Sequence, residues 1–369
     1  MRVKLGNYIS EYSVRNKNSE DIPVYSVTNT QGFCRDYFGK EVASKDKSTY
    51  KIVPKGCFAY NPSRINVGSV DWQRNEERVI VSPLYNVFSV SEELDQQYLY
   101  YFLKSDVALH LIKATATGSV RDNLKFNMLC DFQINLPSLN EQKEIVHCLD
   151  KIKTIIEHRQ QQLQKLDELV KARFVEMFSS CDNMVSMNDL CSIITDGTHQ
   201  PPKFQEQGIP FIFVSNLSNN TITYNAEKFI SEETYSELYK RTPIEIGDLL
   251  LSTVGSYGHP AVVTEDRKFL FQRHIAYMKP RRDKVNSYYL HSVLLAPEGQ
   301  RQIEEKVKGI AQKTLNLSEI RKIMIPIPSI GEQNKFELFV KQLDKSKFVE
   351  IIELLNLLIY TITKEVSPW

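Results

Sequence analysis

Two long stretches of the sequence share one helical pattern, and they constrain the fold more than any other feature. The first, residues 141–178, contains no proline or glycine, and its apolar residues recur every three or four positions. That spacing predicts one amphipathic helix, roughly 55 Å long at about 1.5 Å per residue. The second, residues 332–365, has the same pattern and also begins with Glu-Gln. Helices of this length predict a rod that separates other parts of the chain.

The shared Glu-Gln belongs to an internal repeat. Glu141 and Glu332 are 191 residues apart, and the same offset aligns a series of earlier positions. Nearer the start of each copy the offset is 187, which aligns residues 22–29 with residues 209–216. Chance matches do not keep one register over such a stretch, so the repeat indicates a duplication. The positions aligned by the offset of 191 are Gly56 with Gly247, Tyr98 with Tyr289, Leu103 with Leu294, Gly118 with Gly309, Leu124 with Leu315, Ile134 with Ile325 and Pro137 with Pro328.

The repeat predicts a chain ordered as domain, helix, domain, helix. Short runs rich in β-branched residues, bounded by turns with Gly, Pro and Asn, predict strands in both domains. We therefore expect an α+β fold in which two β-rich domains are separated by two long helices, packed as an antiparallel coiled coil in a pseudo-two-fold repeat. The expected bounds are 1–139 and 182–330 for the domains, and 140–181 and 331–369 for the helices.

The apolar stripes predict which residues join the two helices. The helices are not exact copies, because residues 149–151 match residues 343–345 with three residues more than the offset of 191. Three residues are less than one helical turn, so exact two-fold equivalence of the pair is not expected. We predict an interface of Ile152, Ile155, Leu166 and Leu169 against Phe348, Ile352, Leu355 and Leu358.

Composition and charge exclude several classes of protein. No apolar run approaches the 18 residues of a membrane span, and the first ten residues lack the apolar core of a signal peptide. The six cysteines form no C-x-x-C pair and no zinc-like spacing, so we expect reduced thiols, no metal site and a cytoplasmic protein. The net charge of +1 gives no overall indication of a nucleic-acid partner.

Motifs for catalysis are missing from the sequence. It contains no glycine-rich phosphate loop, no zinc-protease motif and no nucleophile elbow. Residues 60–63 (Tyr-Asn-Pro-Ser) are close to the N-P-P-aromatic motif of DNA amino-methyltransferases, but they lack its second proline and its aromatic residue. A turn that presents polar side chains to a ligand is the better interpretation. We expect a binding protein that is not catalytic by itself and needs no cofactor of its own.

Two similar domains at the ends of a rod suit a long polymer that is contacted at two places, and duplex DNA fits this description. Candidate contacts are polar residues on turn-rich loops at matching places in the repeat, because Arg, Asn and Lys commonly bind base edges and phosphates. A basic cluster at residues 279–284 is either a solvated face or a phosphate-binding patch. The predicted DNA-binding residues are Asn61, Arg64, Asn66, Arg121, Thr198, His199, Lys203, Ser256, Tyr257, Arg273 and Lys313.

The two domain–helix junctions resemble those of the specificity subunits of Type I restriction-modification systems. Residues 136–142 (Leu-Pro-Ser-Leu-Asn-Glu-Gln) and 327–333 (Ile-Pro-Ser-Ile-Gly-Glu-Gln) each lead into a long helix. Residues 196–199 (Asp-Gly-Thr-His) and 209–211 (Ile-Pro-Phe) are also similar to the second half of that family. The resemblance covers essentially the whole chain, in the order that the family has.

The resemblance implies a division of labour. Each domain would be a target recognition domain for one half of a split, asymmetric DNA site, and the helices would set the gap between the halves. Two modification subunits, which carry S-adenosylmethionine and methylate adenine, would bind the helices and domains, and a restriction (motor-nuclease) subunit would join them. Two alternatives stay open: the specificity part of a fused restriction-methyltransferase enzyme, and a scaffold that does not bind DNA.

Overall fold

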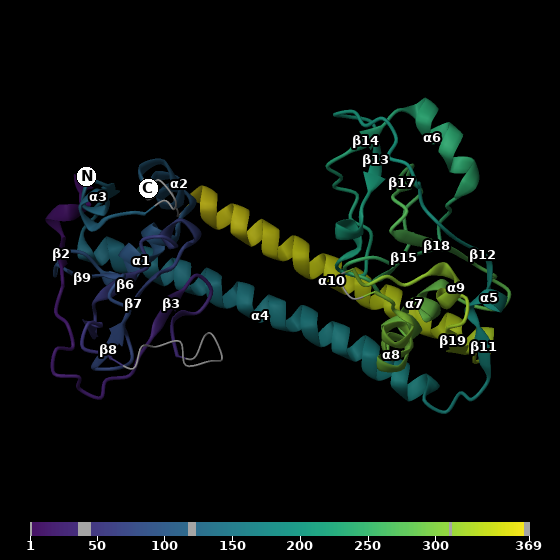
Figure 1. Ribbon diagram of the computed structural model, residues 1–369, viewed down its shortest axis with the longest axis horizontal. Coiled ribbons are helices and arrows are strands. Elements are labelled where there is room, and N and C mark those ends of the chain that lie inside the picture. The colour runs from purple at the N-terminus through teal and green to yellow at the C-terminus, as the bar shows by residue number, and fades with distance from the viewer. Residues whose placement is uncertain (1, 36–45, 117–122, 310–311, 365–369) are drawn as a thin grey trace. The chain divides into compact units, whose positions relative to one another are not determined.

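The computed structural model describes residues 2–35, 46–116, 123–309 and 312–364, without the side chains of residues 348–350 and 352–364. It divides into two compact units, residues 1–158 with 353–369 and residues 159–352. Each unit holds one β-rich domain and part of both long helices, α4 (Leu139–Phe178) and α10 (Ile330–Lys364) (Figure 1). Both helices begin one residue before the expected position. The domain bounds expected from the sequence stay a prediction.

The first domain is built on a four-stranded antiparallel sheet whose strand order is β2-β9-β6-β7. Residues 51–60 form two strands, because Gly56 turns the chain with a φ of 84°. Two-stranded pairings flank the sheet: β1 with β10, β3 with β4 and β5 with β8. The strands are β1 (Arg2–Lys4), β2 (Ile9–Glu11), β3 (Ser26–Thr28), β4 (Gly32–Cys34), β5 (Lys51–Pro54), β6 (Phe58–Tyr60), β7 (Val70–Trp72), β8 (Arg78–Val81), β9 (Asn86–Val90) and β10 (Gln133–Asn135).

Helices cover this sheet and close its core. Residues 96–115 form two helices, because the Ser105 hydroxyl accepts a hydrogen bond from the Ala108 amide at 3.2 Å and starts a new helix. Aromatic side chains fill the space between sheet and helices, and the Phe58 and Phe88 rings stack 5.0 Å apart. The helical segments are η1 (Leu5–Asn7), η2 (Ile65–Val67), α1 (Gln96–Lys104), α2 (Asp106–Thr115) and α3 (Phe126–Cys130).

The central sheet of the second domain matches that of the first, with four antiparallel strands in the order β12-β18-β15-β16. Its flanking sheet joins β14, β13 and β17, and β11 pairs with β19 beside the start of α10. The strands are β11 (Met184–Ser186), β12 (Cys191–Asp196), β13 (Ile209–Ile212), β14 (Phe229–Ile230), β15 (Leu249–Ser252), β16 (Pro260–Val262), β17 (Leu270–Phe271), β18 (Ile275–Pro280) and β19 (Met324–Pro326). The helical segments are α5 (Met187–Leu190), η3 (Val214–Leu217), α6 (Glu232–Leu238), η4 (Tyr239–Arg241), α7 (Ser287–Leu295), α8 (Pro297–Lys306) and α9 (Leu317–Ile320).

Equivalent hydrogen bonds confirm the duplication at the predicted offset. The Tyr98 hydroxyl donates to the Asn135 carbonyl at 2.8 Å, and the hydroxyl of its counterpart Tyr289 donates to the Pro326 carbonyl. The buried Leu124 amide donates to the Pro62 carbonyl at 3.1 Å, just as the Leu315 amide donates to the Thr253 carbonyl at 2.8 Å. Each of these residues is 191 positions from its counterpart, donors and acceptors alike.

Within the second unit, α4 and α10 lie side by side and run in opposite directions, as the sequence predicts (Figure 1). The Phe336 ring lies 5.6 Å from the Phe178 ring, centroid to centroid, near the start of α10. Further along α10, Lys347 forms an ion pair of 2.6 Å with Asp167. The partner number on α4 falls as the number on α10 rises, so this part of the pair is antiparallel.

The predicted interface residues are described in part. Ile152, Ile155 and Leu166 are half-buried. Leu169 is 47% exposed, and the next residue, Val170, packs against the core of the second domain. The side chains of Phe348, Ile352, Leu355 and Leu358 lie outside the described residues. Within the part of the chain that the structure covers, no helix has both the length and the apolar character to cross a membrane.

Candidate nucleic-acid interface

One end of the second domain's sheet gathers most of the predicted contact residues. In an antiparallel sheet the end of one strand lies beside the start of its neighbour. Here Asp196 at the end of β12 pairs with Ala276 near the start of β18, and Ser252 at the end of β15 pairs with Ile275. The loops that follow β12 and β15, and the loop that precedes β18, therefore leave the sheet at the same end.

Backbone hydrogen bonds join these loops into one surface. The Arg273 amide donates to the Thr198 carbonyl at 3.0 Å, and the Thr253 amide donates to the His274 carbonyl at 2.9 Å. The Gly255 amide then donates to the Lys313 carbonyl at 3.2 Å, which adds the segment before α9. The structure thus brings together all seven residues predicted in this domain, and we call this surface loop surface 2. Its predicted members are Thr198, His199, Lys203, Ser256, Tyr257, Arg273 and Lys313.

Gly197 explains why the first of these loops can approach the sheet so closely. A Cβ atom at this position would lie 2.2 Å from the Phe271 carbonyl oxygen, which is an impossible contact. With glycine there, the next amide, that of Thr198, donates to the same carbonyl at 2.9 Å. The Asp-Gly-Thr-His sequence therefore holds its threonine and histidine against the start of β18.

Asp196 holds a histidine and an arginine side chain beside this loop. The two oxygens of Asp196 bind His199 Nε2 and an Arg241 guanidinium nitrogen, each at 2.8 Å. His199 and Arg241 are both about half exposed, so their outer faces stay open to solvent. With Lys203 they line an open cleft of about 480 Å³ between the loop and α6. Basic side chains held in this way can donate hydrogen bonds to the phosphate oxygens or base edges of a nucleic acid.

A second group of side chains lies at the other side of loop surface 2. Lys313 Nζ is 3.3 Å from the Tyr257 hydroxyl and 3.1 Å from a Glu304 oxygen. The hydrogen bond with Glu304 is the main reason that the pKa of Lys313 is raised. Burial and the charge of Arg273 lower the pKa of His274, so that ring stays neutral near neutral pH. The lysine and arginine side chains supply positive charge to the surface.

The first domain presents the corresponding end of its own sheet. Tyr60 at the end of β6 pairs with Asn86 at the start of β9, and residues 61–69 leave the sheet there. The Asn61 side chain accepts hydrogen bonds from the Ser63 amide and hydroxyl at 3.1 and 3.0 Å, so it shapes the turn. Arg64 is exposed and Asn66 is half-buried in the same loop, which we call loop surface 1. Arg121 lies outside the described residues.

Two cations beside these surfaces were not predicted from the sequence. Arg241 follows α6 of the second domain. Lys104 at the end of α1 donates to the Asn29 carbonyl at 3.1 Å and to the Gly68 carbonyl, so it fastens loop surface 1. The adjacent basic pair Lys240-Arg241 was the available signal for Arg241, whereas nothing in the sequence indicates the carbonyl contacts of Lys104.

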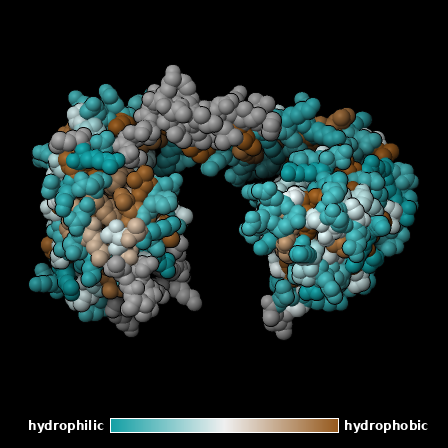
Figure 2. Space-filling view, turned by 90° about the horizontal axis from the view of Figure 1, so that it is seen from above, coloured by the Kyte–Doolittle hydropathy of each residue, from teal (hydrophilic) through white to brown (hydrophobic). Residues whose placement is uncertain are grey.

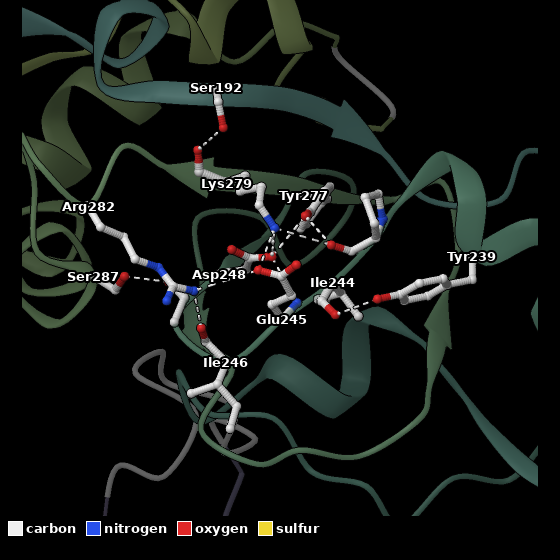
Figure 3. Close-up of polar contacts among 12 residues, drawn as sticks. Ser192, Tyr239, Ile244, Glu245, Ile246, Asp248, Tyr277, Lys279, Arg282 and Ser287 are labelled. Atoms are coloured by element: carbon white, nitrogen blue, oxygen red, sulfur yellow. Dashed lines mark hydrogen bonds and ion pairs between the residues drawn. The ribbon is translucent and has the colours of Figure 1, made fainter.

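The basic cluster at residues 279–284 lies at the opposite end of β18, where Lys279 and Arg282 contact groups of their own domain (Figure 3). Lys279 forms ion pairs with Glu245 at 2.9 Å and with Asp248 at 3.5 Å, and Arg282 donates to the Ile246 carbonyl. Burial raises the pKa of Asp248, which also accepts a hydrogen bond from the Tyr277 hydroxyl at 2.8 Å. These contacts favour a structural role for the cluster over a phosphate-binding patch.

The described residues of loop surface 2 suit binding by polar and charged groups. In the space-filling view the visible face of the second domain is mostly hydrophilic, with hydrophobic residues scattered over it (Figure 2). Among the described residues, no three His, Cys, Asp or Glu side chains are grouped so that they could hold a metal ion. The arrangement can bind an anionic polymer by hydrogen bonds and ion pairs.

Comparison with protein families finds the Type I restriction modification DNA specificity domain twice in this chain, at residues 3–168 and 183–357. The specificity subunit of the Type I restriction enzyme EcoBI of Escherichia coli is 25% identical over 344 residues, which cover 82% of this chain and 72% of that protein. The MjaIX specificity subunit of Methanocaldococcus jannaschii is 23% identical over 316 residues, covering 79% and 72%.

Solved structures share the fold. A chain from a study of complex assembly and conformational transition of the type I R-M system matches with a TM-score of 0.59 and 16% identity, covering 97% of this chain and 94% of that one. The S subunit of a Type I restriction-modification system from M. genitalium matches with a TM-score of 0.53 and 14% identity, covering 98% and 94%. These likenesses show the two-domain fold with its long helices.

Proposed function

Because this chain belongs to the Type I restriction-modification DNA specificity family, we propose that loop surfaces 1 and 2 each bind one half of a split DNA site. The observation that supports this most is positional. In both domains the loops leave the same end of an equivalent sheet, yet the residues they present differ. Equivalent placement suits two sites on one continuous duplex, and different residues suit two different sequences.

The proposed division of labour is supported by the family to which the chain belongs. We propose that methylation is carried out by modification subunits, two per chain, which bring S-adenosylmethionine and bind the long helices and the domains. A restriction subunit with motor and nuclease activity would join that complex in the cytoplasm. The chain itself would supply sequence recognition and, through the length of α4 and α10, the gap between the half-sites.

The test uses the chain assembled with its modification subunits, on genomic DNA whose methylated sites are then mapped. We expect one bipartite motif with two fixed half-sites and one fixed gap. Replacing Arg273 by Ala should relax or weaken one half-site, and replacing Arg64 by Ala should affect the other. If either substitution changed both halves equally, the assignment of one half-site to each domain would be wrong.

A further inference from the structure

The second residue of each Glu-Gln pair is a fully buried glutamine that faces its own domain. Gln142 and Gln333 are both 0% exposed, although each lies in the first turn of a long, largely exposed helix. A buried amide is costly unless its polar atoms are paired. In both copies the side chain forms three hydrogen bonds, so burial is compensated by specific contacts and not by apolar packing.

The partners of the two glutamines are equivalent. Gln142 Oε1 accepts from the Asp95 amide at 2.8 Å, and its Nε2 donates to the carbonyls of Glu93 and Pro137, both at 3.0 Å. Asp95 is the N-cap of α1, so the glutamine joins the long helix to the domain's own helix and to the segment after β10.

In the second copy the three contacts recur 191 residues later. Gln333 Oε1 accepts from the Asn286 amide at 2.8 Å, and its Nε2 donates to the carbonyls of Lys284 at 3.3 Å and Pro328 at 3.0 Å. Asn286 is the N-cap of α7, the counterpart of Asp95. We call each set of three hydrogen bonds a glutamine clamp.

The start of each long helix does not need the clamp for its own stability. The Ser138 hydroxyl and the Glu141 carboxylate cap each other's backbone amides, at 3.4 and 2.8 Å, and Ser329 and Glu332 do the same. These exposed capping boxes satisfy the helix end locally. The glutamine contacts reach 47 and 49 residues back into the domain, so they fix the direction in which the helix leaves the domain.

We propose that Gln142 and Gln333 are positioning residues that make the protein selective for the gap between its half-sites. This inference rests on the proposed function. A tilt of about 10° at a junction displaces a surface roughly 20 Å away by about 3.4 Å, which is one base-pair step of DNA. A junction that can tilt this far accepts a neighbouring gap length, whereas a clamped junction does not. The loops that contact the half-sites are unaffected.

The test compares methylation rates of the complete complex on duplexes with the natural half-sites and with the gap shortened, natural or lengthened by one base pair. Gln142→Glu keeps the acceptor for the Asp95 amide but sets a carboxylate against two carbonyl oxygens. We expect it to reduce the preference for the natural gap about tenfold, while duplexes with an altered half-site stay rejected. Gln333→Glu should act in the same way, independently.

Two controls separate positioning from general stability. Lys143→Ala changes the exposed next residue, and Glu141→Gln keeps a side chain that can cap, so both should leave gap preference unchanged. Equal loss of methylation at every gap, or unchanged preference in both glutamine variants, overturns the clamp while leaving half-site recognition intact. A wild-type complex without any gap preference contradicts the proposed function itself.

A measurement on the wild-type chain covers the case in which the variants do not fold. The Asp95 and Asn286 amides precede their helices and have no partner within them, so amides at such positions ordinarily exchange with water quickly. The clamp predicts that both exchange as slowly as amides of the central strands. Fast exchange at either position would overturn the proposal for that junction.

Discussion

At the end of each domain that leads to a long helix, the two domains make the same side-chain contacts, whereas at the loop end the exposed side chains differ. The glutamine clamps share all three kinds of partner, and the capping boxes share both residues. At the loop end, the offset of 191 sets Arg64 against Gly255 and Asn66 against Tyr257. After duplication, the contacts that join domain to helix were retained, while the side chains that face outward diverged. This difference separates the contacts that support the fold from the exposed side chains that we propose recognise DNA.

The largest expected effect tests a difference inside the junctions. Phe336 is fully buried among Phe174, Phe178 and Tyr289. Phe336→Ala should therefore lower the free energy of unfolding of the second unit by about 3–5 kcal/mol. The equivalent residue of the first domain is the half-buried Ile145, and Ile145→Ala should cost less than about 2 kcal/mol. Hydrogen exchange of the central strands measures both. Equal costs would mean that the aromatic cluster adds nothing to the second junction.

The next effect contrasts the two ends of β18. Arg273 lies on loop surface 2, whereas Arg282 lies at the opposite end among paired charges. Arg273→Ala should weaken DNA binding by about 1–3 kcal/mol, since a lost arginine contact to a base or phosphate costs this much. Arg282→Ala, a matched control in the same domain, should leave affinity unchanged. Competition binding of the complex to its own site measures both, and a larger loss for Arg282 would reverse the assignment of the two ends.

A smaller effect should be the same in both copies. Ser138→Ala and Ser329→Ala each remove a helix N-cap and should cost about 1 kcal/mol. Hydrogen bonds from these serines lower the pKa of Glu141 and Glu332. The stabilisation is therefore present above the ordinary carboxyl pKa and is lost as the pH falls through the lowered pKa. Unfolding of each variant at neutral and acidic pH measures this, and a cost confined to one copy would contradict equivalent junctions.

The smallest effect is a pH dependence that only the second domain should show. Burial raises the pKa of Asp248, so the folded chain holds that proton at a higher pH than the unfolded chain does. The stability that Asp248 contributes is therefore greatest at low pH and is lost as the pH rises through the raised pKa. The equivalent residue is Cys57, whose thiol pKa is raised by burial and does not titrate between mildly acidic and neutral pH.

The measurement compares wild type with Asp248→Asn. The stability of wild type relative to this variant should fall as the pH rises above the ordinary carboxyl pKa and through the raised pKa. A Cys57→Ser variant of the first domain should show no such change relative to wild type. If the Asp248 difference stayed constant over this range, the buried carboxyl would not govern the pH dependence of the second unit.

The sequence predicted the duplicated architecture and the antiparallel helices, because a long apolar stripe and a constant offset can each be recognised from a few residues. It did not indicate the N-cap of the first long helix. The structure shows that Ser138 is the N-cap and Glu141 its partner. This pairing becomes evident only once the helix is known to begin at Leu139.

Part of the candidate site depends on contacts that no local pattern encodes. The seven residues predicted in the second domain come together because four strands of its sheet end or begin at the same side. In the sequence, only the repeat suggested this arrangement. Arg241 joins them only through Asp196, 45 residues away. The buried glutamines were visible in the sequence as part of the shared Glu-Gln, but their three contacts depend on the folded domain.

The central claim is that each domain recognises its own half-site while the junctions and helices set the gap. Exchanging residues 1–139 for the matching domain of a relative, with the junction at Pro137–Gln142 kept, tests this most directly. Mapping of methylated sites across a genome should show one half-site changed, with the other half and the gap unchanged. An insertion of one helical turn near Gln161 should change the gap alone. A domain exchange that altered both half-sites, or an insertion that altered a half-site and not the gap, would contradict the account.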